Sequence, residues 1–200
     1  MSRTMREEVT EFKRASVLKE AARQFYEKGY DGTRIEEIVA TLGVTKPYFY
    51  YLFGSKTELL DEICVQATAI SVETLQAAIA AHTSTLEQLR DAVRRLALQV
   101  IANQVGIAIC FREEKYISAE ARRRLESNRR RFDVMMNDLL ARAKKEGVIS
   151  IHDSQVTAQV LTGALTWTFV WFREGGRLST DEFADQIVEL AMSMLNAKLY

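Results

Sequence analysis

The sequence predicts an all-helical protein with a small N-terminal domain of three helices and a larger helical C-terminal domain. Apolar residues recur at spacings of three and four along most segments, which places them on one face of a helix. Between Thr33 and Leu60, three short helices with recognisable caps follow one another with almost no linker. Gly29, Gly43 and Gly147 each follow such a segment, where a left-handed C-cap ends a helix.

The first helix is expected from about Thr10 to Lys28. Its apolar face is predicted to comprise Phe12, Ala15, Leu18, Ala22 and Phe25. Thr33 is predicted to cap the second helix, which ends at Gly43. The inward face of this second helix is predicted to comprise Ile35, Ile38, Val39 and Leu42.

The third helix is predicted to begin after Thr45, a second N-cap, with Pro47 in its first turn, where the missing N–H costs nothing. Phe49, Leu52 and Phe53 form its inward face, which leaves Lys46, Tyr48, Tyr50 and Tyr51 to project outward. Ser55, with Glu58 three residues later, is predicted to open the next helix as a capping box.

Two helices joined by a short glycine-containing turn form a helix-turn-helix, which places its second helix in the DNA major groove. A lysine supplies charge to phosphates, and a tyrosine offers a ring for a thymine methyl and a hydroxyl for a phosphate. The residues alone are equally consistent with the solvated side of an ordinary short helix.

The segment AARQFYEKGYDGTRIEEIVATLGVTKPYFYYLFGSKTELL, residues 21–60, resembles without a gap the DNA-binding domain of the TetR/AcrR family of repressors. The resemblance implies a homodimer that binds a palindromic operator in double-stranded DNA and releases it when a small molecule enters the C-terminal domain. It implies phosphate contacts from Thr33, Tyr50 and Lys56, and base contacts from Lys46, Pro47, Tyr48 and Tyr51, with Arg34 and Thr45 completing the DNA-binding set. Tyr48 departs from the family, in which many members have a small residue there, so the groove contacts at this position stay open.

The expected division is a DNA-binding domain at residues 1–54 and an effector-binding and dimerisation domain at residues 55–200. Thr85 is predicted to cap one C-terminal helix, and Ser118 to open a long helix that runs to about Lys145. This long helix carries six arginines between Arg122 and Arg131. Interleaved acids favour a solvated, salt-bridged face over a nucleic-acid patch.

The helix expected from Ser154 to Phe172 is apolar on every side in its second half. One domain of this size covers such a helix only in part, so a partner chain is predicted to cover the rest. The last helix, capped by Ser179 or Thr180, is predicted to carry the apolar stripe Phe183, Ile187, Leu190, Ala191, Met194 and Leu195. Two such helices from each of two subunits would form a four-helix interface.

The effector site is expected among aromatic residues and methionines of the long helices. The candidate lining is Phe111, Phe132, Met135, Met136, Trp167, Phe169 and Trp171, with Arg112, Asn128, Arg131 and Asn137 as polar anchors. Plain core is the alternative for such stripes. The segment from Trp171 to Ser179 is similar to one found in family members that sense acyl-CoA thioesters, which makes a thioester the leading effector. A multidrug-type apolar ligand is the second choice.

Composition and motifs argue against a generally basic nucleic-acid-binding protein, a metalloprotein and an enzyme. With 27 basic and 27 acidic side chains the net charge is zero, so any DNA affinity must come from a local arrangement of charge. Cys64 and Cys110 are expected to be buried thiols, and His82 and His152 form no metal-binding pattern. No catalytic triad, phosphate loop or cofactor motif argues for the alternative of a helical-bundle enzyme, and a structural dimer would leave the outward tyrosines without a purpose. The absence of a signal peptide or spanning segment leads us to expect a cytoplasmic protein.

Overall fold

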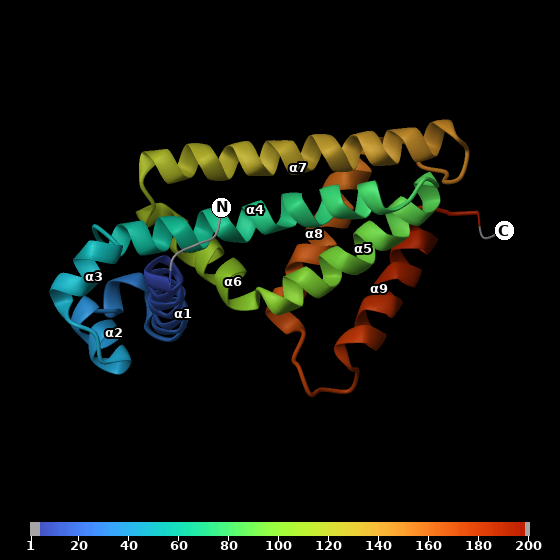
Figure 1. The fold of residues 1–200 in the computed structure, drawn as a ribbon. Helices are drawn as coiled ribbons and strands as arrows, with labels where there is room; N and C mark the ends of the chain where they lie inside the picture. The colour runs from blue at the N-terminus through green and yellow to red at the C-terminus, as the bar shows by residue number, and fades with distance from the viewer. Residues whose placement is uncertain (1–4, 199–200) are drawn as a thin grey trace. The chain divides into compact units, whose positions relative to one another are not determined.

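A computed structural model describes residues 5–198, and in that range the chain forms nine α-helices and one short 3-10 helix, with no strand (Figure 1). The helices are α1 (Met5–Gly32), α2 (Ile35–Leu42), α3 (Lys46–Leu52), α4 (Lys56–Ala81), α5 (Thr85–Ala102), α6 (Gln104–Glu113), η1 (Glu114–Tyr116), α7 (Ala119–Lys145), α8 (Ser154–Trp171) and α9 (Thr180–Met194). The predicted all-helical fold is confirmed.

The chain forms two compact units. Unit 1 consists of Met1–Ala67 and Val105–Arg124, and unit 2 consists of Thr68–Gln104 and Leu125–Tyr200. The division expected from the sequence, 1–54 and 55–200, was drawn between the predicted DNA-binding part and the predicted effector-binding part. The compact units have their boundaries at other positions, after residues 67, 104 and 124. Helices α4 and α7 each contribute residues to both units.

The core of unit 1 forms where α1, α2, α3 and the start of α4 pack together. Its fully or almost fully buried side chains include Val17, Ala21, Phe25, Ile38, Phe49, Phe53, Leu59 and Leu60. The predicted face of α1 is wrong at its N-terminal end, because Phe12 is 74% exposed and Val17 is buried instead. Residues 17, 21 and 25 recur every four positions, so the buried stripe follows this row.

The two cysteines lie in unit 1 as buried thiols that form no disulfide, and their predicted burial is confirmed. Cys64 belongs to α4 and Cys110 to α6. A hydrogen bond with Cys110, together with burial, raises the pKa of the Cys64 thiol well above its ordinary value. The thiol is therefore protonated throughout the physiological range.

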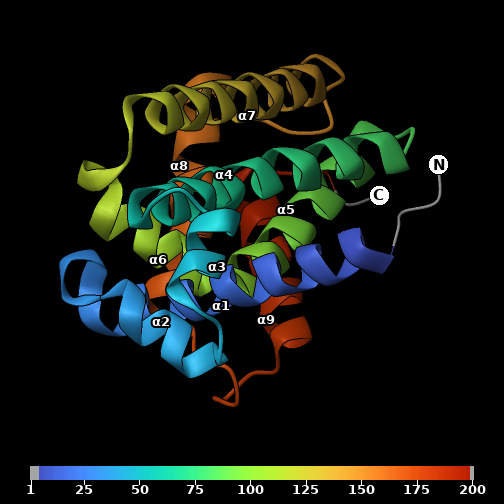
Figure 2. The same ribbon diagram turned by 60° about the vertical axis from the view of Figure 1, so that its left-hand side comes forward.

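Unit 2 is a helical bundle in which α5 packs against both α8 and α9 (Figures 1 and 2). Leu75, Leu89, Met136, Leu139 and Leu161 are among the residues of its core. The N-cap of α5 is Ser84, which accepts a hydrogen bond from Glu87 N, rather than the predicted Thr85. The N-cap of α9 is Ser179, whose side chain forms a reciprocal capping box with Glu182.

Helices α8 and α9 are each buried on one side only. On α8, Ala158, Leu161 and Leu165 face the core. Large apolar side chains on the other sides are exposed: Val156 61%, Val160 54%, Trp167 57%, Trp171 54%, and on α9 Leu190 67% and Met194 41%. We call these six side chains the α8–α9 apolar face. Its exposure in the single chain agrees with the expectation that a partner covers it.

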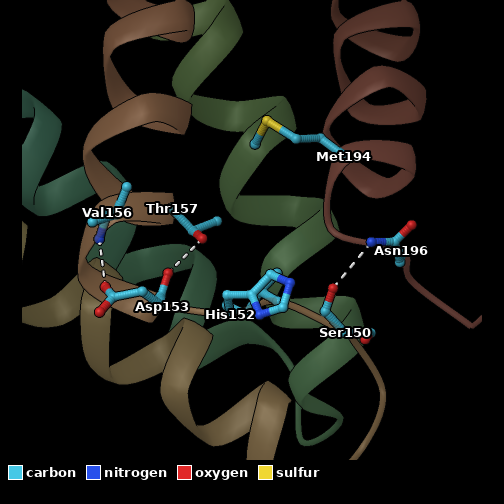
Figure 3. A pocket seen from close by; sticks show the side chains of 8 residues that line it. Ser150, His152, Asp153, Val156, Thr157, Met194 and Asn196 are labelled. Atoms are coloured by element: carbon cyan, nitrogen blue, oxygen red, sulfur yellow. Dashed lines mark hydrogen bonds between the residues drawn. The ribbon is translucent and has the colours of Figure 1, made fainter.

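One surface cavity of unit 2, about 320 Å³, lies between the start of α8 and the end of α9 (Figure 3). It is lined by Ser150, Ile151, His152, Asp153, Val156, Thr157, Met194 and Asn196. Its polar groups are used locally, since Asp153 accepts from Val156 N and Asn196 donates to the Ser150 carbonyl. Val156 and Met194 also belong to the α8–α9 apolar face, so the cavity opens at the edge of that face.

Within residues 5–198, α4 is the one unbroken helix with the length and apolar composition to cross a bilayer. Leu59, Leu60 and Leu75 of this helix are fully buried. A core helix of a folded domain has the same properties.

Candidate nucleic-acid interface

Helices α2 and α3 form the predicted helix-turn-helix. Gly43 ends α2 in the left-handed conformation, with φ 62°, and the N–H of Val44 donates to the Val39 carbonyl at 3.1 Å. Thr45 caps α3 by accepting from Tyr48 N at 3.4 Å. The turn is therefore fixed by hydrogen bonds on both sides, which sets the direction of α3.

The two faces of α3 separate as the sequence predicts. Phe49 and Leu52 are buried, as is Phe53 directly after the helix. Lys46, Pro47, Tyr50 and Tyr51 are exposed, and Tyr48 is half-buried. The exposed fractions of Tyr50 and Tyr51 are 50% and 71%, large for aromatic side chains on a seven-residue helix. This face offers two phenol hydroxyls and an ammonium group to a ligand in solution.

The charges around α3 are arranged in pairs. Lys46 forms an ion pair with Glu36 of α2. Their hydrogen bond raises the pKa of Lys46 and lowers the pKa of Glu36, so both groups are charged at neutral pH. On α1, the Lys13 ammonium lies 5.0 Å from the centre of the Tyr48 ring. Residue spacing did not predict Glu36 and Lys13 as neighbours of the recognition helix, because no local pattern indicates that α1 and α2 bring them there.

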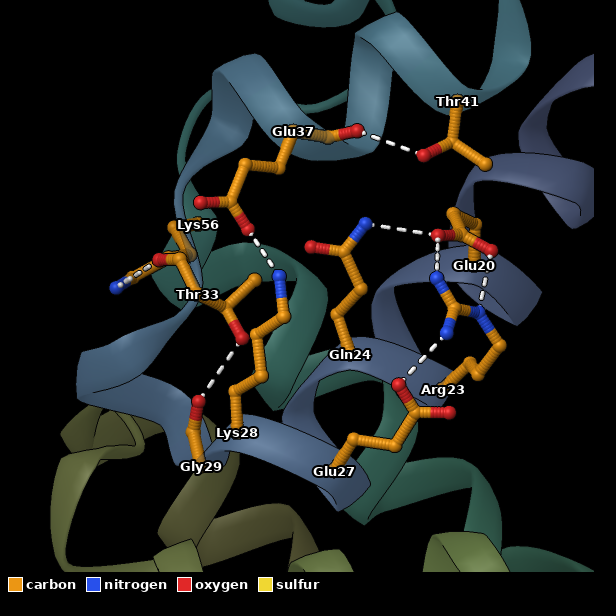
Figure 4. Close-up of polar contacts among 10 residues, drawn as sticks. All are labelled: Glu20, Arg23, Gln24, Glu27, Lys28, Gly29, Thr33, Glu37, Thr41 and Lys56. Carbon is orange, nitrogen blue, oxygen red and sulfur yellow. Dashed lines mark hydrogen bonds and ion pairs between the residues drawn. The ribbon is translucent and has the colours of Figure 1, made fainter.

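Thr33 does not cap α2, so this prediction is wrong. The N-cap is Arg34, which is exposed and makes no side-chain capping bond. Thr33 is 1% exposed, and its hydroxyl donates to the Gly29 carbonyl at 2.9 Å (Figure 4). A buried hydroxyl that is already hydrogen-bonded secures the α1–α2 connection and does not face solvent.

Lys56 also serves this connection. Its ammonium donates to the carbonyls of Tyr30 at 2.8 Å and Thr33 at 3.0 Å, and it lies 4.2 Å from the centre of the Tyr30 ring. At the same helix start, Ser55 accepts from Glu58 N at 3.0 Å, but the Glu58 carboxylate accepts from Gly54 N and not from Ser55 N. The predicted capping box is therefore present in shifted form.

Figure 4 shows the polar contacts within and between α1 and α2. Lys28 of α1 pairs with Glu37 of α2 at 2.5 Å. Within α1, Glu20 accepts from Arg23, which lowers the pKa of the Glu20 carboxyl, and also from the amide nitrogen of Gln24. Of these contacts, the Lys28–Glu37 ion pair joins α1 to α2, whereas those of Glu20 lie within α1.

Arg14 anchors the other end of α3. Its guanidinium donates to the Leu52 carbonyl at 2.5 Å, pairs with Glu62 and lies 4.0 Å from the centre of the Phe53 ring. It thereby occupies one of the carbonyls that the end of a helix leaves without an intrahelical partner. Local sequence patterns could not have predicted this role, because Leu52 and Glu62 lie 38 and 48 residues after Arg14 in the chain.

The candidate effector residues occupy different surroundings. In unit 2, Phe132 is buried in the hydrophobic core and Met135 packs against it, whereas Trp167 and Trp171 are more than half exposed. Phe111 belongs to unit 1 and is 57% exposed. In the single chain Phe132 is thus a core side chain and the two tryptophans are surface side chains, and their assignment to one aromatic effector cavity stays a prediction.

The polar candidates also separate. Arg112 is not placed as an effector anchor, because its guanidinium donates to the carbonyls of Phe25 and Tyr26 in α1, at 3.2 and 2.8 Å. In the same unit, the Tyr116 hydroxyl donates to Asp31, and its ring stacks on Tyr30 with 4.9 Å between ring centres. Asn128, in unit 2, donates to the Thr68 hydroxyl at 3.1 Å. Arg112 and Tyr116 thus hold α6 and η1 to the end of α1.

No group of three or more histidine, cysteine, aspartate or glutamate side chains within the described residues is arranged to hold a metal ion. The polar groups that α3 exposes are the hydroxyls of Tyr50 and Tyr51 and the ammonium of Lys46. Such groups bind phosphate and base edges, and they need no cofactor to do so.

Comparison with known proteins agrees with this geometry. Residues 17–63 match the family model described as bacterial regulatory proteins of the tetR family, and residues 72–195 match the tetracyclin repressor-like C-terminal domain. The HTH-type transcriptional repressor KstR2 of Rhodococcus jostii RHA1 is 24% identical over 185 residues, which cover 92% of this chain and 91% of the relative.

Two solved structures extend the comparison. PfmR, a TetR family transcriptional regulator from Thermus thermophilus, is 28% identical with a TM-score of 0.81, over 92% of this chain and 99% of that chain. AibR, solved in complex with isovaleryl coenzyme A and operator DNA, is 25% identical with a TM-score of 0.77. The match covers 88% of this chain and 96% of the AibR chain. The matching families and relatives are transcriptional regulators and not enzymes. This chain is a member of the TetR family of ligand-responsive transcriptional repressors.

Proposed function

We propose that the α3 surface binds the major groove of a palindromic operator and that an acyl-CoA thioester releases the protein from it. The observation that carries the DNA part is the exposed face of α3, with Tyr50, Tyr51 and Lys46 outward and a capped turn behind it. Tyr50 and Lys46 are assigned to phosphates and base edges, and Tyr51 to a thymine methyl. Thr33 and Lys56 act indirectly by fixing the connection before α2.

A homodimer is part of this proposal, because a palindrome requires two recognition helices about 34 Å apart. The α8–α9 apolar face supports it, since two copies of one exposed apolar surface bury each other about a twofold axis. Sedimentation should give a species of twice the 22.8 kDa chain mass at micromolar concentration. Val160→Glu, which puts a charge on this face, should yield monomers.

Phe12→Glu is the matched control for the dimer. Phe12 is also apolar and exposed, at 74%, but it lies on α1 of unit 1 and outside the α8–α9 apolar face. If Phe12→Glu dissociated the protein as well, or if Val160→Glu remained dimeric, a different surface would mediate association.

Two observations support the thioester. AibR, whose solved complex contains isovaleryl coenzyme A and operator DNA, matches most of this chain. The segment Trp171–Ser179 also resembles that of acyl-CoA-responsive family members. The competing multidrug-type ligand is favoured by Phe132 and Met135 of α7, apolar side chains of unit 2 that would offer contact without polar selectivity.

The test measures the coupling between two ligands. The purified protein selects a duplex from a random-sequence pool, and anisotropy then measures its affinity for that duplex with and without isovaleryl-CoA and longer acyl-CoAs. The thioester should weaken DNA binding by roughly 1 to 3 kcal/mol, and DNA should weaken thioester binding by the same factor. A panel that leaves DNA affinity unchanged, while an apolar drug-like compound lowers it, would establish the multidrug-type function instead. As a regulator that binds operator DNA, the protein would act in the cytoplasm.

A further inference from the structure

Two glutamines on α5 are equally buried but differ in their hydrogen bonding. Gln88 is 7% exposed and Gln99 is 8% exposed. Both ends of the Gln88 amide are paired, since Nε2 donates to the His82 carbonyl and Oε1 accepts from Arg142, each at 2.6 Å. The Gln99 Oε1 accepts from the Ser71 hydroxyl at 3.2 Å, but no partner for its Nε2 is present in the described structure.

An unpaired amide nitrogen inside a protein is an unfilled hydrogen-bonding position. Buried polar groups are nearly always paired, because the loss of their hydration is otherwise uncompensated. The other buried polar side chains of unit 2 are paired: Thr85 donates to Glu146, and Thr168 donates to the Leu165 carbonyl. The position of Gln99 therefore calls for an acceptor that the chain itself does not supply.

The surroundings of Gln99 define the kind of acceptor. Thr68 and Ser71 lie three residues apart on α4 and so share a face of that helix. Ser71 contacts Gln99, and Thr68 accepts from Asn128 of α7. Two hydrogen-bonded pairs thus join α4 to its neighbours in unit 2, Ser71 with Gln99 of α5 and Thr68 with Asn128 of α7, and all four side chains are polar and uncharged. None of the four carries a charge that could balance a carboxylate.

We propose that the Gln99 amide donates a hydrogen bond to an uncharged carbonyl oxygen of the effector. This inference rests on the proposed function, in which the effector is an acyl-CoA, and it assigns the thioester carbonyl to Gln99 Nε2. A free carboxylic acid is disfavoured at this position because its anion would be buried without a counter-charge. A pure hydrocarbon is disfavoured because it would leave the donor unfilled.

The first test needs no ligand and uses Gln88 as the matched control. Gln99→Leu removes an unpaired donor together with a single hydrogen bond from the Ser71 hydroxyl, so its melting temperature should fall less than that of Gln88→Leu. Gln88→Leu leaves both the His82 carbonyl and the Arg142 guanidinium without this partner, so its melting temperature should fall. Equal losses in the two variants would show that the Gln99 amide is fully paired within the folded chain, which would overturn the proposal.

The second test compares isovaleryl-CoA with its isopentyl thioether, in which a methylene replaces the carbonyl. Calorimetry should show that the parent protein binds the thioester about 3- to 10-fold more tightly, the effect of one neutral hydrogen bond. Gln99→Leu should bind both compounds equally. If the variant kept the preference, Gln99 would not contact the carbonyl, while the acyl-CoA function would stand. If the parent protein bound neither compound, the thioester function and this subsite would both fall.

Discussion

Glu36→Gln is expected to strengthen DNA binding and to steepen its dependence on salt. Lys46 begins α3 and pairs with Glu36, so this corner of the recognition surface carries no net charge. The hydrogen bond raises the pKa of Lys46 and lowers that of Glu36. Both groups therefore keep their charges at neutral pH, and the ion pair persists. Glutamine keeps the shape of the side chain and removes its negative charge, which leaves the Lys46 ammonium for a phosphate.

The magnitude follows from counterion release. Each neutralised phosphate contributes about −0.9 to the slope of log K against log salt, so one lysine in each of two subunits adds about −1.8. Between 50 and 200 mM salt, this difference corresponds to a further loss of affinity of roughly 12-fold relative to the parent. Anisotropy titrations on the selected duplex at several salt concentrations measure the slope.

Glu37→Gln is the control for this prediction. Glu37 is the next residue of the same helix and also pairs with a lysine, but its partner Lys28 lies on α1 and not on α3. A general gain of positive charge would change the slope equally in both variants. Equal slopes in Glu36→Gln and Glu37→Gln, or no change in either, would refute the assignment of Lys46 to a phosphate.

Four further predictions concern unit 1. Tyr50→Phe should weaken operator binding by about 1 kcal/mol, one hydrogen bond, without changing the melting temperature, because the hydroxyl is on an exposed side chain; unchanged binding would remove Tyr50 from the interface. Lys56→Met should lower the free energy of unfolding by about 2 kcal/mol, because its ammonium bonds two backbone carbonyls, and chemical denaturation would show whether it does. Iodoacetamide should modify Cys64 and Cys110 only after unfolding. Because folding raises the pKa of Cys64, its contribution to stability is complete below the ordinary value of 9.0 and is lost as the pH rises above it, which melting curves at pH 8 and 10 would reveal.

The parts of the fold that depend on local rules could be predicted from the sequence. Gly43 and Thr45 fix the turn through neighbours no more than five residues away, so the helix-turn-helix and the outward side of α3 follow from residue type and spacing. The Thr33 prediction failed because two local choices compete. A threonine hydroxyl can cap the helix that follows or bond a carbonyl four residues back, and here it bonds Gly29.

The effector residues depended on contacts that spacing does not encode. Arg112 looks like a free cation in the sequence, yet its partners in α1 lie 86 and 87 residues away. Trp167 and Trp171 are aromatic residues of an apolar helix, but the sequence does not say which side of α8 the chain covers. The sequence around Gln99 does not distinguish it from other glutamines. Its amide nitrogen becomes a buried donor without a partner only when α4 and α5 pack together.

The return of α6 and η1 to unit 1 limits how this regulator can be recombined. Arg112 and Tyr116 attach residues 105–124 to the end of α1, and Leu59 and Leu60 of α4 fill the core beneath α3. A chimera made by one cut after residue 54 would separate the DNA-reading helices from both supports. Grafting this DNA specificity onto another sensor therefore requires two segments, 1–67 and 105–124, so a single crossover between two such genes would not transfer it intact.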